Sequence, residues 1–151
     1  MTDFDLSITR QIAAPLAVLY RCWTDPALLV RWFTLASWVS VSAKLDVRPG
    51  GASLIVMHGP DGSEMHNRDQ YLEVVPNERL ILTDAYLGDW VPSDKPFMTV
   101  VLTFAEEDGG TRYKATVRHW SAEDRDAHAA MGFDANWNTS TDQLAALAVT
   151  L

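Results

Sequence analysis

The sequence predicts an α+β domain in which a curved antiparallel sheet of about seven strands wraps round a long C-terminal helix. Between residues 38 and 120, apolar side chains largely alternate with polar ones, and short turns rich in Gly and Pro separate the runs. Residues 121–151 instead repeat apolar side chains every three or four positions, which is typical of an amphipathic helix. The 151 residues suit a single domain, residues 1–151, with one core.

The first 33 residues predict one strand and two short helices. Residues 4–12 alternate and indicate a half-buried strand. Pro15 is tolerated in a first helical turn, so a helix is expected to continue to about residue 23. Asp25-Pro26 then starts a second helix that carries Trp32 and Phe33.

Six further strands follow in the prediction, at residues 38–47, 52–58, 64–75, 79–86, 97–106 and 111–120. The turns between them are short, so neighbouring strands should be antiparallel. Alternation places Val39, Val41, Ala43, Leu45 and Val47 on one face of their strand. In the last strand it turns Tyr113, Ala115, Val117 and His119 towards the helix. Residues 87–96 form the longest loop and carry Trp90.

The C-terminal segment begins with a helix start signal. Ser121 is a good N-cap, and Asp124 completes a pattern like a capping box. Gly132 and the weak helix formers of residues 136–141 predict a bend or break near the middle. The apolar stripe predicts that Trp137 and Leu144 are buried and that Asp142 is exposed.

Charge and composition exclude several classes of partner. The net charge is −8 and no stretch gathers Lys and Arg, so no nucleic-acid partner and no membrane partner are expected. The one cysteine, Cys22, cannot form an intrachain disulfide and is expected to pack in the core. The N-terminus lacks the basic and apolar regions of a signal peptide, so a cytoplasmic location is expected.

No metal site and no cofactor are predicted. The four histidines (His58, His66, His119 and His128) lack metal-ligand spacing, and no phosphate-binding or dinucleotide-binding motif is present. His128 follows Asp124 by four residues, which favours a surface pair between them. His119 turns inward, which favours a hydrogen-bonded structural histidine.

Helical and strand periods together predict a cavity between the sheet and the C-terminal helix. Its expected lining is Phe133, Trp137, Ser140, Thr141 and Leu144 from the helix, and Tyr86, Met98, Tyr113 and His119 from the sheet. The loop of residues 87–96 is the expected lid. Ser140 and Thr141 can alternatively satisfy their hydroxyls on the helix backbone. If the cavity is catalytic, Asp84, Tyr86 and His119 are the candidate acid or base groups.

Several short motifs carry a resemblance to a known family. They are Ile12-x-Ala14-Pro15, Trp23-Thr24-Asp25-Pro26, Trp32, Arg48-x-Gly50-Gly51, Gly62, Tyr71-Leu72-Glu73-Val74-Val75-Pro76-x-Glu78-Arg79-Leu80, Thr83-Asp84, and Trp137 ahead of Asp142-Gln143-Leu144. The chain resembles the bacterial single-domain homologues of the activator of heat-shock protein 90 ATPase, of the START-like helix-grip (SRPBCC) superfamily. This resemblance covers nearly the whole chain and implies that fold. The family often has a glycine and an apolar residue where this chain has Asp69-Gln70, and glycines where it has Asn136 and Asn138.

The sequence favours binding of a small hydrophobic or aromatic molecule without turnover. Two alternatives stay open. The same cavity could serve a cyclase-like or hydrolase-like enzyme, or, as the family name suggests, the protein could be a chaperone partner. A homodimer also stays open.

Overall fold

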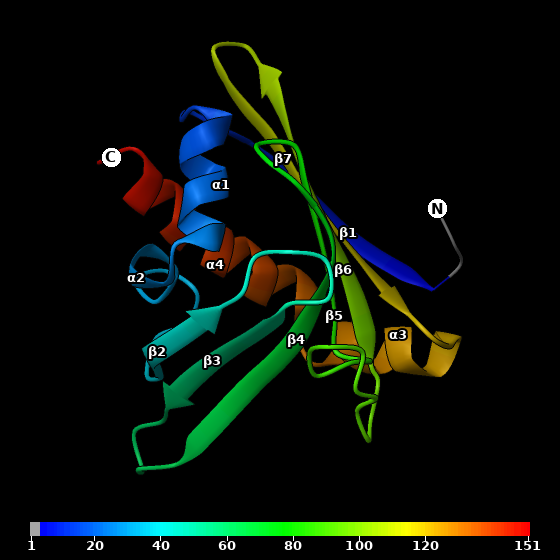
Figure 1. The fold of residues 1–151 in the computed structure, drawn as a ribbon. Helices are drawn as coiled ribbons and strands as arrows, with labels where there is room; N and C mark the ends of the chain where they lie inside the picture. The colour runs from blue at the N-terminus through cyan, green and yellow to red at the C-terminus, as the bar shows by residue number, and fades with distance from the viewer. Residues whose placement is uncertain (1–3) are drawn as a thin grey trace.

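One seven-stranded antiparallel sheet forms the frame of the computed structural model, which describes residues 4–151 (Figure 1). Residues 1–3, the start of the segment expected to lack signal-peptide features, lie outside the described residues. The sheet order is β1-β7-β6-β5-β4-β3-β2, so β1 and β2 form its edges. The strands are β1 (Asp5–Ile12), β2 (Val39–Leu45), β3 (Ala52–His58), β4 (Glu64–Val75), β5 (Arg79–Thr83), β6 (Met98–Glu107) and β7 (Gly110–His119).

The α+β class, the strand count and the antiparallel pairing are therefore confirmed, and the sheet curves round the last helix (Figure 1). The N-terminal strand closes the order by pairing with the last one, from Asp5 opposite Arg118 to Ile12 opposite Thr111. Inward residues of β7 are buried as the alternation predicts, since Tyr113, Ala115, Val117 and His119 are each less than a tenth exposed.

Two strand predictions need correction. The strand expected at residues 79–86 ends at Thr83, because the carboxylate of Asp84 accepts hydrogen bonds from the backbone N–H groups of Phe97 and Met98 and diverts the chain from the ladder. The expected single face of β2 is interrupted by a register shift between Ser40 and Ser42 against β3. Val39 and Val41 are exposed, whereas Ala43 and Leu45, which the alternation placed on the same face, are partly buried.

The two helices after β1 are α1 (Leu16–Thr24) and α2 (Pro26–Leu29). Asp25 caps α2 by accepting a hydrogen bond from the Ala27 N–H at 3.0 Å. The second helix is shorter than predicted. After Leu29 the backbone bonds become tighter turns, such as the one from the Trp32 N–H to the Leu29 carbonyl.

The C-terminal segment contains two helices, α3 (Ala122–Ala130) and α4 (Phe133–Ala148). Ser121 caps α3, accepting from the Asp124 N–H at 3.1 Å, which confirms the predicted start. The break falls at Gly132, whose φ of 93° is a left-handed conformation that favours glycine. The weak helix formers of residues 136–141 remain helical, and Thr141 donates its hydroxyl to the Trp137 carbonyl one turn earlier, at 2.7 Å.

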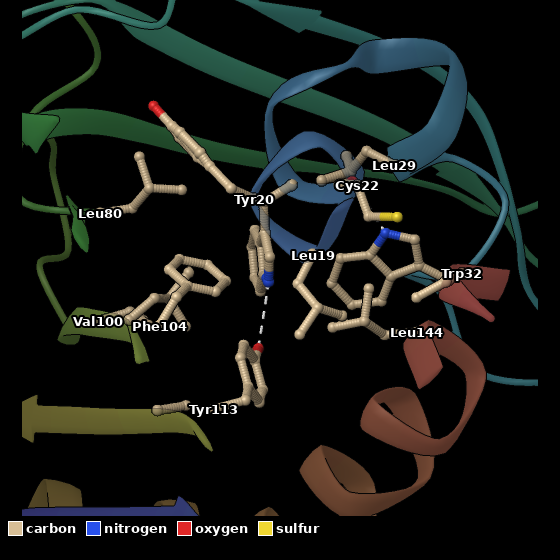
Figure 2. Close-up of a cluster of buried hydrophobic side chains, with 14 of the residues drawn as sticks. Leu19, Tyr20, Cys22, Leu29, Trp32, Leu80, Val100, Phe104, Tyr113 and Leu144 are labelled. Carbon is tan, nitrogen blue, oxygen red and sulfur yellow. Dashed lines mark hydrogen bonds between the residues drawn. The ribbon is translucent and has the colours of Figure 1, made fainter. Parts of the chain in front are cut away.

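The inward side chains of α4 meet α1 and the sheet in one core. Figure 2 shows Leu144 beside Leu19 and Trp32. Leu144 is fully buried, and the Trp23 indole donates a hydrogen bond to the Tyr113 hydroxyl at 3.2 Å. Cys22 is buried as a free thiol, as expected. Asp142 lies outside and pairs with Arg10 at 2.6 Å, which ties α4 to β1. Among the described residues, no helix has the length and apolar character needed to cross a membrane.

Candidate functional site

An apolar cavity of about 70 Å³ lies between the sheet, the α1–α2 region and α4. We call it the inner cavity. Its wall consists of Trp23, Leu29, Phe33, Leu45, Ser53, Ile55, Asn67, Asp69, Tyr71, Leu82, Met98, Val100 and Trp137. These residues come from α1, α2 and the segment after it, five neighbouring strands (β2 to β6), and α4. The sheet's curvature therefore leaves space beneath the helices that the side chains do not fill.

A wider and more open space of about 210 Å³ adjoins the inner cavity. We call it the outer hollow. It is lined by Trp23, Trp32, Phe33, Leu35, Met98, Tyr113, Asn136, Trp137 and Ser140. Trp23, Phe33, Met98 and Trp137 belong to both walls, so the two spaces are neighbours.

Aromatic contacts hold this shared wall in place. The Trp23 and Phe33 rings meet edge to face at 6.1 Å, and Trp32 packs against both. On α4, Trp137 lies 5.7 Å from Phe133, which is one turn earlier. The shared wall is thus formed by large side chains that are positioned by their own packing.

Three polar side chains interrupt the apolar wall of the inner cavity. Ser53 on β3 is paired directly with Asp69 on β4, and Asn67 lies two residues before Asp69 on the same face. The Asn67 amide donates to the Asp69 carboxylate at 2.8 Å. Asp69 keeps part of its surface accessible, but that surface lines the cavity.

The pKa of Asp69 is raised from 3.8 to about 7, chiefly by burial and also by the nearby Asp84 carboxylate, while the hydrogen bond from Asn67 opposes both effects. Burial also raises the pKa of the Tyr71 and Tyr113 hydroxyls, so both phenols stay neutral. Tyr71 shares a hydrogen bond with Ser53, and Tyr113 accepts one from Trp23. Asp69 is therefore the wall group of the inner cavity whose charge changes near neutral pH.

The structure brings together part of the predicted lining. Met98 and Trp137 contact both spaces, and Tyr113 and Ser140 line the outer hollow. Phe133, Thr141 and Leu144 are buried in the packed interface instead. The Ser140 and Thr141 hydroxyls both donate to the Trp137 carbonyl, so back-bonding satisfies them.

The three candidate catalytic groups do not converge on the cavity. Asp84 accepts from two backbone N–H groups beyond the end of β5. The pKa of Asp84 is raised, because the effect of burial exceeds that of the two hydrogen bonds, which lower it. Tyr86 packs against Trp90 at 5.4 Å and forms a bridge with Pro92. His119 lies at the end of β7 and donates from Nδ1 to the Phe4 carbonyl at 2.7 Å.

His128 does not form the surface pair with Asp124 that its spacing predicted. Its Nδ1 lies 2.8 Å from Nε2 of His119, since α3 folds back over the end of β7. The Phe4 carbonyl can only accept, so His119 carries its proton on Nδ1 and its Nε2 accepts from His128. Burial and the neighbouring His119 lower the pKa of His128. The inward placement of His119 and its structural hydrogen bonding agree with the sequence prediction.

The loop of residues 87–96 is not a lid over the cavity. The Trp90 N–H donates to the side-chain oxygen of Gln70 at 2.8 Å, and Gln70 faces away from the cavity because it follows Asp69 on β4. The Asp89 N–H donates to the Gly50 carbonyl, and the Trp90 indole lies over Gly50. These bonds hold the loop on the outer face of the sheet, and none of its residues lines either space.

The residues that depart from the family pattern, Asp69-Gln70, Asn136 and Asn138, lie in different parts of the structure. Asp69 lines the inner cavity, whereas Gln70 is fully buried on the other face, and its amide nitrogen lacks a hydrogen-bond partner within the described chain. Asn136 borders the outer hollow. Asn138 points to the β1 edge, where its side-chain oxygen accepts from Arg10 at 3.2 Å.

Sequence reasoning missed Ser53 and Asn67 as lining residues and noted Asp69 only as a departure. The strand of residues 64–75 has no clean alternation because Asn67 and Asp69 put polar groups on its inner face. The signal that could have found them is the register of the β3–β4 hairpin, since Ser53 and Ile55 are paired with Asp69 and Asn67. Trp23 and Phe33 were likewise absent from the predicted lining, although both line the inner cavity and the outer hollow.

A larger hollow of about 490 Å³ lies elsewhere, between the start of α1 and the β6–β7 turn. It is more open, and its wall includes Glu106, Glu107 and Asp108. The smaller inner cavity is the better site for a small apolar molecule, because enclosure and aromatic walls exclude water. Within residues 4–151, no three His, Cys, Asp or Glu side chains gather closely enough to hold a metal ion.

A sheet curved round a C-terminal helix, with an apolar cavity between them, defines an α+β helix-grip domain. A sequence model of the family described as "Activator of Hsp90 ATPase homolog 1-like protein" matches residues 13–148. The chain belongs to this family, as the sequence motifs predicted. No curated protein matches the chain significantly.

Solved structures agree with this assignment. A protein from Nitrosomonas europaea is 34% identical to this chain in sequence, and its crystal structure matches with a TM-score of 0.93. The match covers 97% of this chain and 96% of that chain. A crystal structure from Mycobacterium smegmatis is 30% identical with a TM-score of 0.80, covering 95% and 90%. The solution structure of an AHSA1-like protein from Aeromonas hydrophila, 21% identical, has the same fold with a TM-score of 0.75 and covers 95% and 90%.

Proposed function

We propose that the protein binds a small hydrophobic or aromatic molecule between the sheet and α4, without turning it over. The observation that carries this proposal is the pair of adjoining unfilled spaces, about 70 and 210 Å³, that share an aromatic wall. Small-molecule sites are typically concave and mostly apolar, with a few polar groups that orient the ligand. The wall of the inner cavity, with Ser53, Asn67 and Asp69 among apolar side chains, has this composition.

Native mass spectrometry of the purified protein tests the proposal directly, because a tightly held molecule adds its mass to the protein ion. A second test uses 2-phenylethanol, a neutral aromatic probe, and records tryptophan fluorescence. Binding should quench or shift the emission, and Trp137→Phe should remove most of that response, because Trp137 lies in both walls.

Trp120→Phe is the matched control. Trp120 is 52% exposed and lines neither space, so this variant should keep the response to the probe. The absence of both a co-purified molecule and a probe response would contradict the proposal.

Consumption of an ester, lactone or polyketide-like aromatic would instead favour a cyclase-like or hydrolase-like enzyme. Loss of that turnover in Asp84→Asn or His119→Ala would assign those residues.

The family match over residues 13–148 supports a second candidate, a chaperone partner. The family's description refers to an activator of the Hsp90 ATPase. The test is the ATPase rate of a bacterial chaperone of that class with and without the protein. A concentration-dependent increase would support this candidate. An unchanged rate, together with no association in sedimentation experiments, would count against it.

A further inference from the structure

The inner cavity contains a carboxylate whose charge has no cationic partner among the described residues. Asp69 lies on the inner face of β4, opposite Ser53, and lines the cavity with apolar neighbours such as Ile55 and Leu82. Asn67 donates one hydrogen bond to Asp69 Oδ2, and no Lys or Arg in the described part of the chain forms an ion pair with Asp69. A buried charge is costly unless it is paired, so this position is unfavourable for the protein alone.

A second carboxylate increases that cost. Asp84 follows β5 and is close enough to Asp69 to disfavour its ionised form. Burial and the Asp84 carboxylate act in the same direction, and the pKa of Asp69 is raised to about 7. A cation placed in the inner cavity would pair with the buried charge of Asp69 and so offset both its desolvation cost and its repulsion by Asp84.

The wall shared with the outer hollow also suits a cation that carries an apolar body. Trp23, Phe33 and Trp137 line both spaces, and the faces of aromatic rings attract cations. The outer hollow, at about 210 Å³, is three times as large as the inner cavity, and Trp32 and Tyr113 add two more rings to its wall. A ligand could therefore place a small charged head inside and an aromatic ring outside. The net charge of −8 favours the approach of a cation.

We propose that the ligand is an arylalkylamine or a similar amine, with its ammonium group paired with Asp69 and its ring against Trp23, Phe33 and Trp137. The proposal rests on the proposed function, which it narrows to one chemical class. Asp69 acts as the specificity-determining residue, and Asn67 holds its carboxylate in position.

The experiment compares 2-phenylethylamine with 2-phenylethanol by isothermal titration calorimetry at about pH 8, where Asp69 is mostly ionised. The probes have the same carbon skeleton and differ at one terminal group. Wild type should bind the amine about tenfold more tightly or better, since a charge-assisted contact adds roughly 1.4 kcal/mol or more. Asp69→Asn should lose that preference and keep its affinity for the alcohol.

Asp108→Asn is the control with the same change of net charge, because Asp108 lies on the exposed β6–β7 turn. It should keep the wild-type preference. In wild type, affinity for the amine should fall as the pH decreases below about 7, and calorimetry should detect proton release on binding, because the ammonium favours ionised Asp69. Asp69→Asn should show neither effect.

The outcomes separate this inference from the proposed function. Equal affinities for the two probes in wild type, or an amine preference that survives in Asp69→Asn, would overturn the inference and leave apolar binding standing. Tighter binding of the alcohol would overturn it as well. Failure of both probes to bind would contradict the inference and the proposed function together.

Discussion

His119 and His128 form a direct imidazole–imidazole hydrogen bond of 2.8 Å that joins the end of β7 to α3. The rings meet nearly perpendicularly, with centroids 5.1 Å apart, and Phe97 packs against both. The sequence placed these residues nine positions apart in different roles, one in the core and one on the surface. Their contact makes the α3 connection sensitive to protonation.

We predict that the His119–His128 contact destabilises the fold as the solution becomes acidic. Burial, then His119, lowers the pKa of His128 below 6.5. Below about pH 6.5 the unfolded chain binds a proton at His128 more readily than the folded chain does. The free energy of unfolding therefore decreases as the pH is lowered. His128→Gln should flatten this slope and cost about 1 kcal/mol near neutral pH. Urea unfolding of both proteins between about pH 5 and 8 measures the difference. Parallel stability curves would contradict the prediction.

Asp69 should show the opposite pH dependence. Its folded pKa of about 7 exceeds the usual 3.8, so the folded state binds more protons in that interval and stability falls as pH rises through it. Asp69→Asn should therefore be more stable at about pH 8, by roughly 1–4 kcal/mol, and the gain should vanish near pH 4. Chemical denaturation across this range checks it, with Asp108→Asn as the charge-matched control. A destabilised Asp69→Asn at about pH 8 would show that the cavity compensates this charge.

Replacing Leu144 by Ala should cost about 2–5 kcal/mol in unfolding free energy. Leu144 has no exposed surface and lies in the core between α4, Leu19 and Trp32 (Figure 2). Leu151→Ala makes the same chemical change where the side chain is 45% exposed, and should cost less than about 0.5 kcal/mol. Denaturant melts of the two variants give the comparison. Similar losses in both would mean that α4 does not pack as described.

The break between α3 and α4 should depend on Gly132. Its φ of 93° is strained for a residue with a Cβ, and a Cβ there would lie 3.3 Å from the Asn136 amide. Gly132→Ala should cost about 1–2 kcal/mol. Gly132→Asn should cost less, since Asn tolerates the left-handed conformation. Thermal melts followed by circular dichroism would rank the variants, and a more stable Gly132→Ala would show that an unbroken helix is accommodated.

The sequence by itself determined the elements whose signals are local. Period-two alternation specified the inward face of β7 from Tyr113 to His119, because each side chain's direction follows from its neighbours along the strand. Ser121 specified the start of α3 through a cap that needs only Asp124, three residues later. The motifs likewise identified the family, and they identified the helix-grip fold because they mark turns, caps and core positions along almost the whole chain.

Tertiary structure alone decided the composition of the site. The register shift in β2 and the diversion at Asp84 depend on hydrogen bonds with other strands, so alternation within one strand could not predict them. The lid prediction was wrong because Gln70, twenty residues before Trp90, holds the loop on the outer face. Asp69 becomes a candidate ligand-binding group only when β3, β5 and α4 surround it with apolar walls. The pKa of Asp69 is raised by burial and by the nearby Asp84 carboxylate. Neither cause can be recognised from the pattern of residues along the sequence.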